Sequence, residues 1–269
     1  KNPHVKNDNL LKKTAWMDLQ FIENEKQKKQ QDNLIEAILK SGNDLYLWIT
    51  LNPQMYYSPK ARHLKKKDIY WKTIKRFTKK LKTKAKALNV KTPRILIGYE
   101  ITNNIYEPYL PQKPAIDLYG NRYFDIPAPL DKSFWETEIK KPLEVFLQKW
   151  NNSTIGNEIE IGGIVLDLEM YCRRTTGSIL DTMGFRPENL QTFNSSFGKT
   201  IDLLKEKQLQ KYFKFLENRS EKIGENLRKY FRQQLPGCII ACYAPNISTN
   251  WFYKGLYKGL GTQEKPVQL

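Results

Sequence analysis

The sequence predicts an α/β protein of the (β/α)8, TIM-type barrel class, built as a single domain over residues 1–269 and incomplete or truncated in this chain. Short apolar segments of strand length alternate with helical patterns, which is typical of parallel βα units. Polar or acidic residues stand at the end of each apolar segment, as they do at the carboxyl ends of barrel strands. An open doubly wound sheet is the competing architecture, but no glycine-rich phosphate loop follows the first apolar strand.

The first half of the chain predicts two helix and strand pairs followed by a long loop. Apolar residues at helical spacing predict helices over 32–40 and 68–88. Compact apolar runs predict buried strands over 44–51 and 93–100. Residues 101–130 are rich in Pro, Tyr and Asn and show no period, so a long loop of the kind that often carries function is expected there.

The second half continues the alternation. A helix is expected over 142–150, and a near-continuously apolar strand over 161–169. One long or broken helix is expected over 209–230, before a fourth strand at 237–243. Residues 266–269 resemble the opening of a fifth strand. A closed barrel has eight strands, so this pattern predicts an incomplete barrel.

The composition restricts the classes of partner and cofactor. The chain has 45 Lys and Arg against 28 Asp and Glu, a net charge of +17. Most of this surplus falls at residues 60–86, where the solvated face of a predicted helix accounts for it, so nucleic acid is the least favoured partner. The mean hydropathy is −0.64 and no apolar run predicts a membrane span. With 3 Cys and 2 His and no metal-ligand spacing, neither a metal nor a cofactor is expected.

The triplet Asp167-Leu168-Glu169 is the most informative part of the sequence. Side chains alternate across a strand, so Asp167 and Glu169 share one face and the leucines share the other. Two neighbouring carboxyl groups repel each other and are costly to bury, so a core alone does not explain them. One proton-donating carboxyl beside one ionised carboxylate is the arrangement that glycosidic bond cleavage requires. An ion-paired or metal-bound role is the alternative.

A resemblance to a known family rests on the same residues. The run Gly-Ile-Val-Leu-Asp-Leu-Glu at 163–169, followed by Tyr171, resembles the fourth-strand signature of chitinase-like glycoside hydrolases, which are barrel glycosidases with an Asp-x-Glu strand end. The resemblance implies that Glu169 is the general acid and that Asp167 orients the N-acetyl group of the substrate, which serves as the internal nucleophile. The earlier aspartates of that signature are replaced here by Gly162 and Val165.

Further candidate residues stand at the ends of the other strands. If two protein carboxylates do the chemistry, Glu100 at the end of the second strand is the expected partner. Aromatic rings that stack on sugars and amides that bond hydroxyl groups are the expected substrate-binding residues. These candidates are Trp48, Asn52, Tyr99, Tyr171, Tyr243, Asn246 and Trp251. The resemblance implies that Tyr243 steadies the reacting sugar.

The sequence therefore predicts a glycoside hydrolase that acts on an oligosaccharide or polysaccharide by carboxylate acid/base catalysis. Two alternatives stay open. One is a catalytically inactive carbohydrate-binding barrel, which Gly162 and Val165 favour. The other is a basic nucleic-acid-binding protein. The sequence predicts neither an oligomeric state nor a compartment.

Overall fold

The computed structural model confirms an α/β protein with a parallel sheet, and it describes residues 14–18, 28–42, 44–48, 67–100, 111–168, 183–243 and 250–262. The main sheet has five parallel strands in the order β1-β2-β3-β6-β7, which is also their order along the chain. These strands are β1 (Thr14–Asp18), β2 (Asp44–Trp48), β3 (Ile95–Glu100), β6 (Ile161–Asp167) and β7 (Ile239–Tyr243). A separate antiparallel hairpin joins β4 (Pro114–Ile116) to β5 (Arg122–Pro127).

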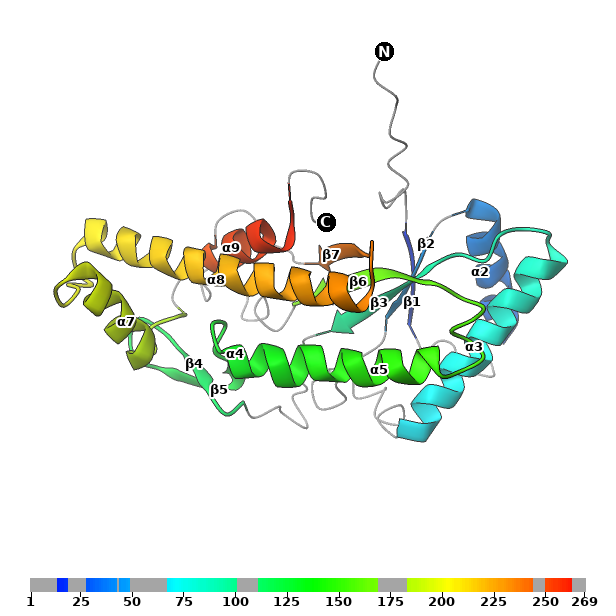
Figure 1. Cartoon of the computed structure of the whole chain (residues 1–269), viewed down its shortest axis with the longest axis horizontal. Coiled ribbons are helices and arrows are strands. Elements are labelled where there is room, and N and C mark those ends of the chain that lie inside the picture. The colour runs from blue at the N-terminus through cyan, green and yellow to red at the C-terminus, as the bar shows by residue number, and fades with distance from the viewer. Residues whose placement is uncertain are drawn as a thin grey trace, which may run out of the picture.

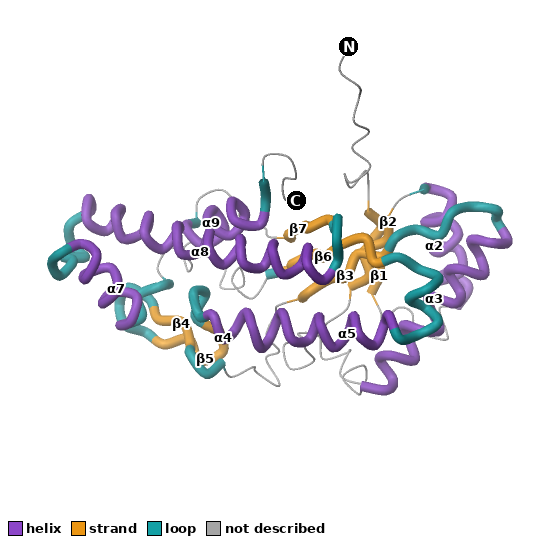
Figure 2. The backbone as a smooth tube through the Cα atoms, in the orientation of Figure 1, coloured by secondary structure: helices purple, strands orange, loops and turns teal. Residues whose placement is uncertain are grey.

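The helices connect the strands and extend beyond the sheet at both ends of the molecule. They are α2 (Lys28–Ser41), α3 (Lys67–Ala87), α4 (Lys132–Phe134), the π-helix η4 (Trp135–Lys140), α5 (Lys141–Asn151), α7 (Pro187–Phe197), α8 (Glu206–Gln234) and α9 (Trp251–Leu260). Figure 1 shows α2 and α3 at one end of the long axis and α7 with the β4–β5 hairpin at the other. The sheet lies between these ends, as the strand colouring in Figure 2 makes clear. Within the described ranges, no helix is both long and apolar enough to span a membrane.

One face of the sheet packs against the helices. Alternate strand residues such as Ile97, Ile164 and Leu166 belong to a single large apolar cluster with side chains of α2, α3, α5 and α8. The intervening residues form a second, separate cluster on the opposite face: Leu96, Val165, Ile239 and Ala241. Right-handed crossovers between parallel strands in chain order place all connecting helices on one face, which explains this division. The sheet is therefore singly wound, with its connecting helices on one face, and it differs from the doubly wound alternative.

The structure confirms most of the predicted elements and adds several that the sequence did not predict. The strands at β2, β3, β6 and β7 are present, and the helix predicted over 209–230 is the unbroken α8. The additional elements are β1, α4, η4, α7, α9 and the β4–β5 hairpin, which lies within the stretch predicted as a long loop over 101–130. In the described part of the chain β1 and β7 are the two edges of an open sheet, so closure into a barrel is not seen there. The strand predicted at 266–269 lies outside the described residues.

An ion pair joins the amino ends of β2 and β3. Arg94, just before β3, donates from Nη2 to Asp44 Oδ2 at 2.6 Å and from Nε to Asp44 Oδ1 at 3.1 Å. Such a bidentate contact fixes both position and orientation. Arg94 and Asp44 thus have a structural role.

Candidate functional site

Three residues at the carboxyl ends of neighbouring strands lie in one row of the sheet. Glu100 of β3 is the register partner of Asp167 of β6. Asp167 is in turn the register partner of Tyr243 of β7. All three are candidate site residues predicted from the sequence, and the strand pairing brings their backbones together. The carboxyl edge of a parallel sheet is where α/β proteins build their sites.

The surroundings of Asp167 match the predicted alternation of side chains. Leu166 and Leu168 are fully buried and belong to the helix-side cluster, whereas Val165 belongs to the cluster on the opposite face. Asp167 is 9 % exposed and, two residues after Val165, occupies the face away from the helices. The predicted division of this strand into a leucine face and an acidic face is confirmed as far as residue 168.

The row of the sheet next to Asp167 is apolar. Val165 pairs with Gly98 on one side and with Ala241 on the other. The position where the resembled signature carries another aspartate therefore lies among apolar side chains, and Val165 is 7 % exposed.

Several predicted site residues have no described side chain. Glu169, Tyr171, Asn52 and Asn246 lie outside the described residues. Four others are placed by their backbone alone, within β2, β3 and β7: Trp48, Tyr99, Glu100 and Tyr243. Their predicted roles remain predictions.

Trp251, the remaining predicted aromatic, is the first residue of α9 and is 4 % exposed. Its Cζ2 atom lies so close to Gly184 that a Cβ at that glycine would be 3.0 Å away. Its ring also packs edge-on against Phe252, with 5.9 Å between ring centroids. In this structure the ring fills space beside the loop that precedes α7.

Helix α9 fixes the end of the strand that carries Asp167. The buried hydroxyl of Tyr253 donates to the carbonyl oxygen of Leu168 at 3.3 Å. Asn250 caps this helix, since its side chain accepts from the backbone N–H of Phe252 at 2.7 Å. The residue after Asp167 is thus tied to an element that comes 85 residues later in the chain.

The chain segments that follow β3 and β6 dock on each other. The backbone N–H groups of Gly184 and Phe185 both donate to the carbonyl oxygen of Ile116 in β4, each at 3.1 Å. An antiparallel bridge also pairs Asp117 with Met183. Connections from the carboxyl edge of the sheet therefore combine into one lobe, made of the β4–β5 hairpin and the start of α7.

A buried carboxylate organises the turn of that hairpin. Asp117 is 3 % exposed and accepts hydrogen bonds from the backbone N–H groups of Tyr119 and Asn121, the Asn121 amide and the Tyr123 hydroxyl, at 2.8–2.9 Å. Burial acts to raise the pKa of Asp117, but the hydrogen bonds from Asn121, Tyr123 and Tyr119 together lower it below its ordinary value. The carboxylate therefore stabilises the turn in its ionised form.

The stability of the protein is expected to depend on pH through Asp117. Its folded pKa lies below the unfolded value of about 3.9, so its contribution is complete above about pH 4 and is lost as the pH falls through the folded pKa. Asp117→Asn is expected to cost about 2 kcal/mol near neutral pH. Urea unfolding of both proteins from pH 6 to pH 3 should show this difference narrowing below pH 4. A difference that stays constant with pH would contradict the role assigned to the ionised group.

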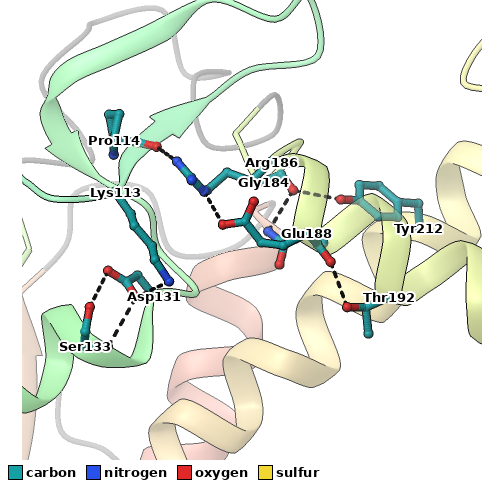
Figure 3. A network of polar contacts seen from close by, with 10 residues as sticks. Lys113, Pro114, Asp131, Ser133, Gly184, Arg186, Glu188, Thr192 and Tyr212 are labelled. Atoms are coloured by element: carbon teal, nitrogen blue, oxygen red, sulfur yellow. Dashed lines mark hydrogen bonds and ion pairs between the residues drawn. The ribbon is translucent and has the colours of Figure 1, made fainter.

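The carbonyl of Gly184 is the second organising point of the lobe (Figure 3). It accepts from the Tyr212 hydroxyl at 2.8 Å and from the Asn189 amide at 3.1 Å. Gly184 has a φ of 116°, a conformation that glycine adopts readily and other residues do not. Burial raises the pKa of Tyr212, so its hydroxyl remains a donor. Together these contacts fix the entry into α7.

Sequence reasoning missed this lobe and the charged residues around it. An Asp-x-x-Gly turn at 117–120 and the Arg-Pro step at 186–187 were the available local signals. Neither signal shows that the two segments meet.

Comparisons with known proteins add no family to these observations. The chain matches no protein-family model, and a search of the curated proteins finds no match.

Proposed function

We propose that this protein is a glycoside hydrolase whose site lies at the carboxyl edge of the main sheet, and that further strands close this sheet into a barrel. The observation that carries the proposal is the register row of Glu100, Asp167 and Tyr243 on three adjacent strands. Two acids and a phenol side by side at this edge suit hydrolysis of a sugar better than they suit a packed core. The winding of all five strands in chain order supports the barrel.

In the proposed mechanism Glu169 protonates the oxygen of the leaving sugar. Glu100 serves as the second carboxylate, and Asp167 positions the substrate. The backbones of the register partners Glu100 and Asp167 are about 4.8 Å apart, and Glu169 follows Asp167 by two residues in the sequence. The apolar row at Val165 carries no further carboxylate. Its absence favours the pair of Glu169 and Glu100 over the substrate-assisted route of the resembled family.

The remaining candidate residues bind the sugar chain in this proposal. Aromatic rings at strand ends stack on the C–H faces of sugars, and amide side chains exchange hydrogen bonds with hydroxyl groups. Trp48, Tyr99, Tyr171 and Tyr243 are the proposed platforms, and Asn52 and Asn246 are the proposed amides.

Asp167→Asn is expected to lower kcat/KM on a β-linked oligosaccharide by about 100-fold, because the amide keeps the shape of the side chain and removes its charge. Release of reducing ends from a panel of β-linked oligosaccharides measures this effect. Glu160→Gln is the matched control, because Glu160 is exposed and directly precedes the opposite end of β6. It should keep full activity, and both variants should unfold at the temperature of the parent protein.

Two outcomes would decide against hydrolysis. If the parent protein binds glycans but cleaves none of them, the inactive carbohydrate-binding alternative is correct, as Gly162 and Val165 would suggest. If Asp167→Asn and Glu160→Gln behave alike on a substrate that the parent protein cleaves, the acidic row is not the site.

A further inference from the structure

A pocket of about 370 Å³ lies in the lobe built from the segments after β3 and β6. One wall is the segment from the end of β5 into α4, another is the start of α7, and α8 contributes Arg219. Its apolar floor is formed by Ala128 and Leu130, which are 3 % and 7 % exposed. Charged groups beside an apolar floor interact more strongly than they do in open water.

Positive charge exceeds negative charge in the lining. Four cationic side chains line the pocket: Lys113, Lys132, Arg186 and Arg219. Among the lining residues that the structure describes, Asp131 and Glu188 are the only acidic ones.

Each of these carboxylates is already engaged. Glu188 accepts from Nε of Arg186 at 2.6 Å, and Asp131 pairs with Nζ of Lys113 at 3.6 Å (Figure 3). Asp131 also accepts from the backbone N–H and the hydroxyl of Ser133 at the start of α4. Burial acts to raise the pKa of Glu188, but the hydrogen bond and charge of Arg186 contribute to a net lowering, so this ion pair persists.

Two cations of the lining remain without a carboxylate. Arg219 lies over the ring of Phe215, 5.5 Å from its centroid, and pairs with no acid in the described part of the chain. Lys132 likewise has no ion pair within the described residues. After both acids are matched, the lining keeps an excess of about two positive charges over its apolar floor.

Arg186 is held in place before any ligand arrives. Its Nε bonds Glu188 and its Nη1 donates to the carbonyl oxygen of Pro114 at 2.7 Å, and its side chain is 18 % exposed. Its Nη2 has no acceptor among the described residues. A guanidinium fixed on two sides with a free edge is suited to binding an oxyanion, because little side-chain entropy remains to be lost.

We propose that this pocket binds a doubly charged tetrahedral oxyanion, a phosphate group or a sulfate ion, through Arg186, Arg219 and Lys132. Two unmatched cations favour a dianion over a carboxylate, which carries one charge and a planar geometry. The proposal stands on the pocket alone and does not depend on hydrolytic activity. In a glycoside hydrolase it would mean a sugar substrate that carries a phosphate monoester, since a sulfate ester carries only one negative charge.

Calorimetric titration of the full chain with inorganic phosphate, sulfate and acetate at pH 8 and constant ionic strength tests the proposal. Phosphate and sulfate should bind saturably at one site, and acetate should bind at least about tenfold more weakly. Lys132→Gln combined with Arg219→Gln should weaken both dianions by at least about tenfold. Lys132→Gln alone, at an exposed position, provides a variant with little risk to folding and should weaken binding severalfold. Lys222→Gln, an exposed lysine of α8 outside the pocket, is the matched control.

Lowering the pH from 8 to 5.5 should weaken the binding of phosphate, because phosphate loses its second charge over this range. Sulfate keeps both charges, so its binding should not weaken for this reason. Tighter binding of phosphate at pH 8 identifies a phosphate group as the ligand, and tighter binding of sulfate identifies the free sulfate ion. Absence of saturable binding by either dianion overturns the proposal. Equal weakening by Lys222→Gln, or unchanged binding by the double variant, overturns it as well, since both results would reflect the general charge of +17.

Discussion

Glu169→Gln is expected to lower kcat/KM on a β-linked oligosaccharide about a thousandfold, as general acid catalysis contributes about 10²–10⁴. Gln keeps the size of the side chain and its hydrogen-bonding reach, but it has no proton to give. An oligosaccharide leaves as a poor alkoxide, so cleavage depends strongly on that proton. Initial rates of reducing-end release by parent and variant measure the loss.

A second substrate separates proton donation from a general loss of structure. An aryl glycoside with a weakly basic phenolate leaves without protonation, so Glu169→Gln should reduce its cleavage by less than about tenfold at the glycosylation step. The variant should therefore show a much steeper dependence of rate on leaving-group basicity than the parent protein. Such a change in slope is what an acid produces, and a residue that only orients the substrate would slow both substrates equally.

Equal losses on both substrates would remove Glu169 from the role of acid and leave Glu100 as the candidate. Unchanged activity on both would remove Glu169 from the chemistry and leave Asp167 to be judged by Asp167→Asn. In either case the register of Glu100 with Asp167 remains, because it depends on backbone pairing alone.

The sequence predicts the parallel sheet well because each buried strand is a compact apolar run. Strand β6, for example, is buried from Gly162 to Asp167, and such a run can only lie inside. Prediction from the sequence fails at β1, whose five residues lie in a polar stretch. It also fails at the β4–β5 hairpin, whose strands are short and bounded by Pro114 and Pro127. These elements form because neighbouring segments supply partners, which no local pattern records.

The candidate site divides in the same way. Asp167 could be predicted, because a carboxylate that ends an apolar strand is visible in the sequence and alternation fixes its face. The pocket around Arg186 could not, because its walls are contributed by segments far apart in the chain. The hydrogen bond of Arg186 to Pro114, for instance, joins residues 72 positions apart. Charged residues in such segments look like ordinary surface until the segments meet.

Helix α9 was not predicted because of its glycines, and the same glycines lead to a prediction of a large effect on stability. Its sequence, WFYKGLYKGL, holds two glycines, and glycine is among the poorest helix formers. Packing explains them. A Cβ at Gly255 would lie 2.2 Å from the carbonyl oxygen of Glu217 in α8, and one at Gly259 would lie 2.0 Å from that of Glu221. The two helices therefore touch backbone to backbone.

Further contacts hold the two helices at this distance. The hydroxyl of Ser220 donates to the carbonyl oxygen of Phe252 at 2.7 Å, and Nη1 of Arg228 donates to that of Gly259 at 2.6 Å. On the α8 side, a Cβ at Gly224 would lie 2.3 Å from the carbonyl oxygen of Leu256. The nearest neighbour of each of these glycines is a backbone atom, so no side-chain movement can relieve an added methyl group.

Gly259→Ala is consequently expected to destabilise the protein by about 3 kcal/mol. Helix propensity alone predicts the opposite sign, since Ala in place of Gly inside a helix adds up to about 1 kcal/mol of stability. The steric term is larger, because α9 must move away from α8 and lose contacts of its buried side chains. Thermal unfolding should report a midpoint lower by roughly 10 °C. Lys254→Ala, on the exposed side of the same helix, is the control and should be close to neutral.

The same substitution connects the fold to the candidate site. A displaced α9 shifts Tyr253, whose hydroxyl holds the carbonyl of Leu168, and so loosens the end of the strand that carries Asp167. Gly259→Ala should therefore raise the hydrogen-exchange rate at the end of β6 more than at its beginning, where Ile95 donates to the carbonyl of Glu160 from the neighbouring strand. A neutral or stabilising Gly259→Ala would mean that α8 and α9 are farther apart than in this structure, and the positioning of Asp167 by α9 would then have no basis.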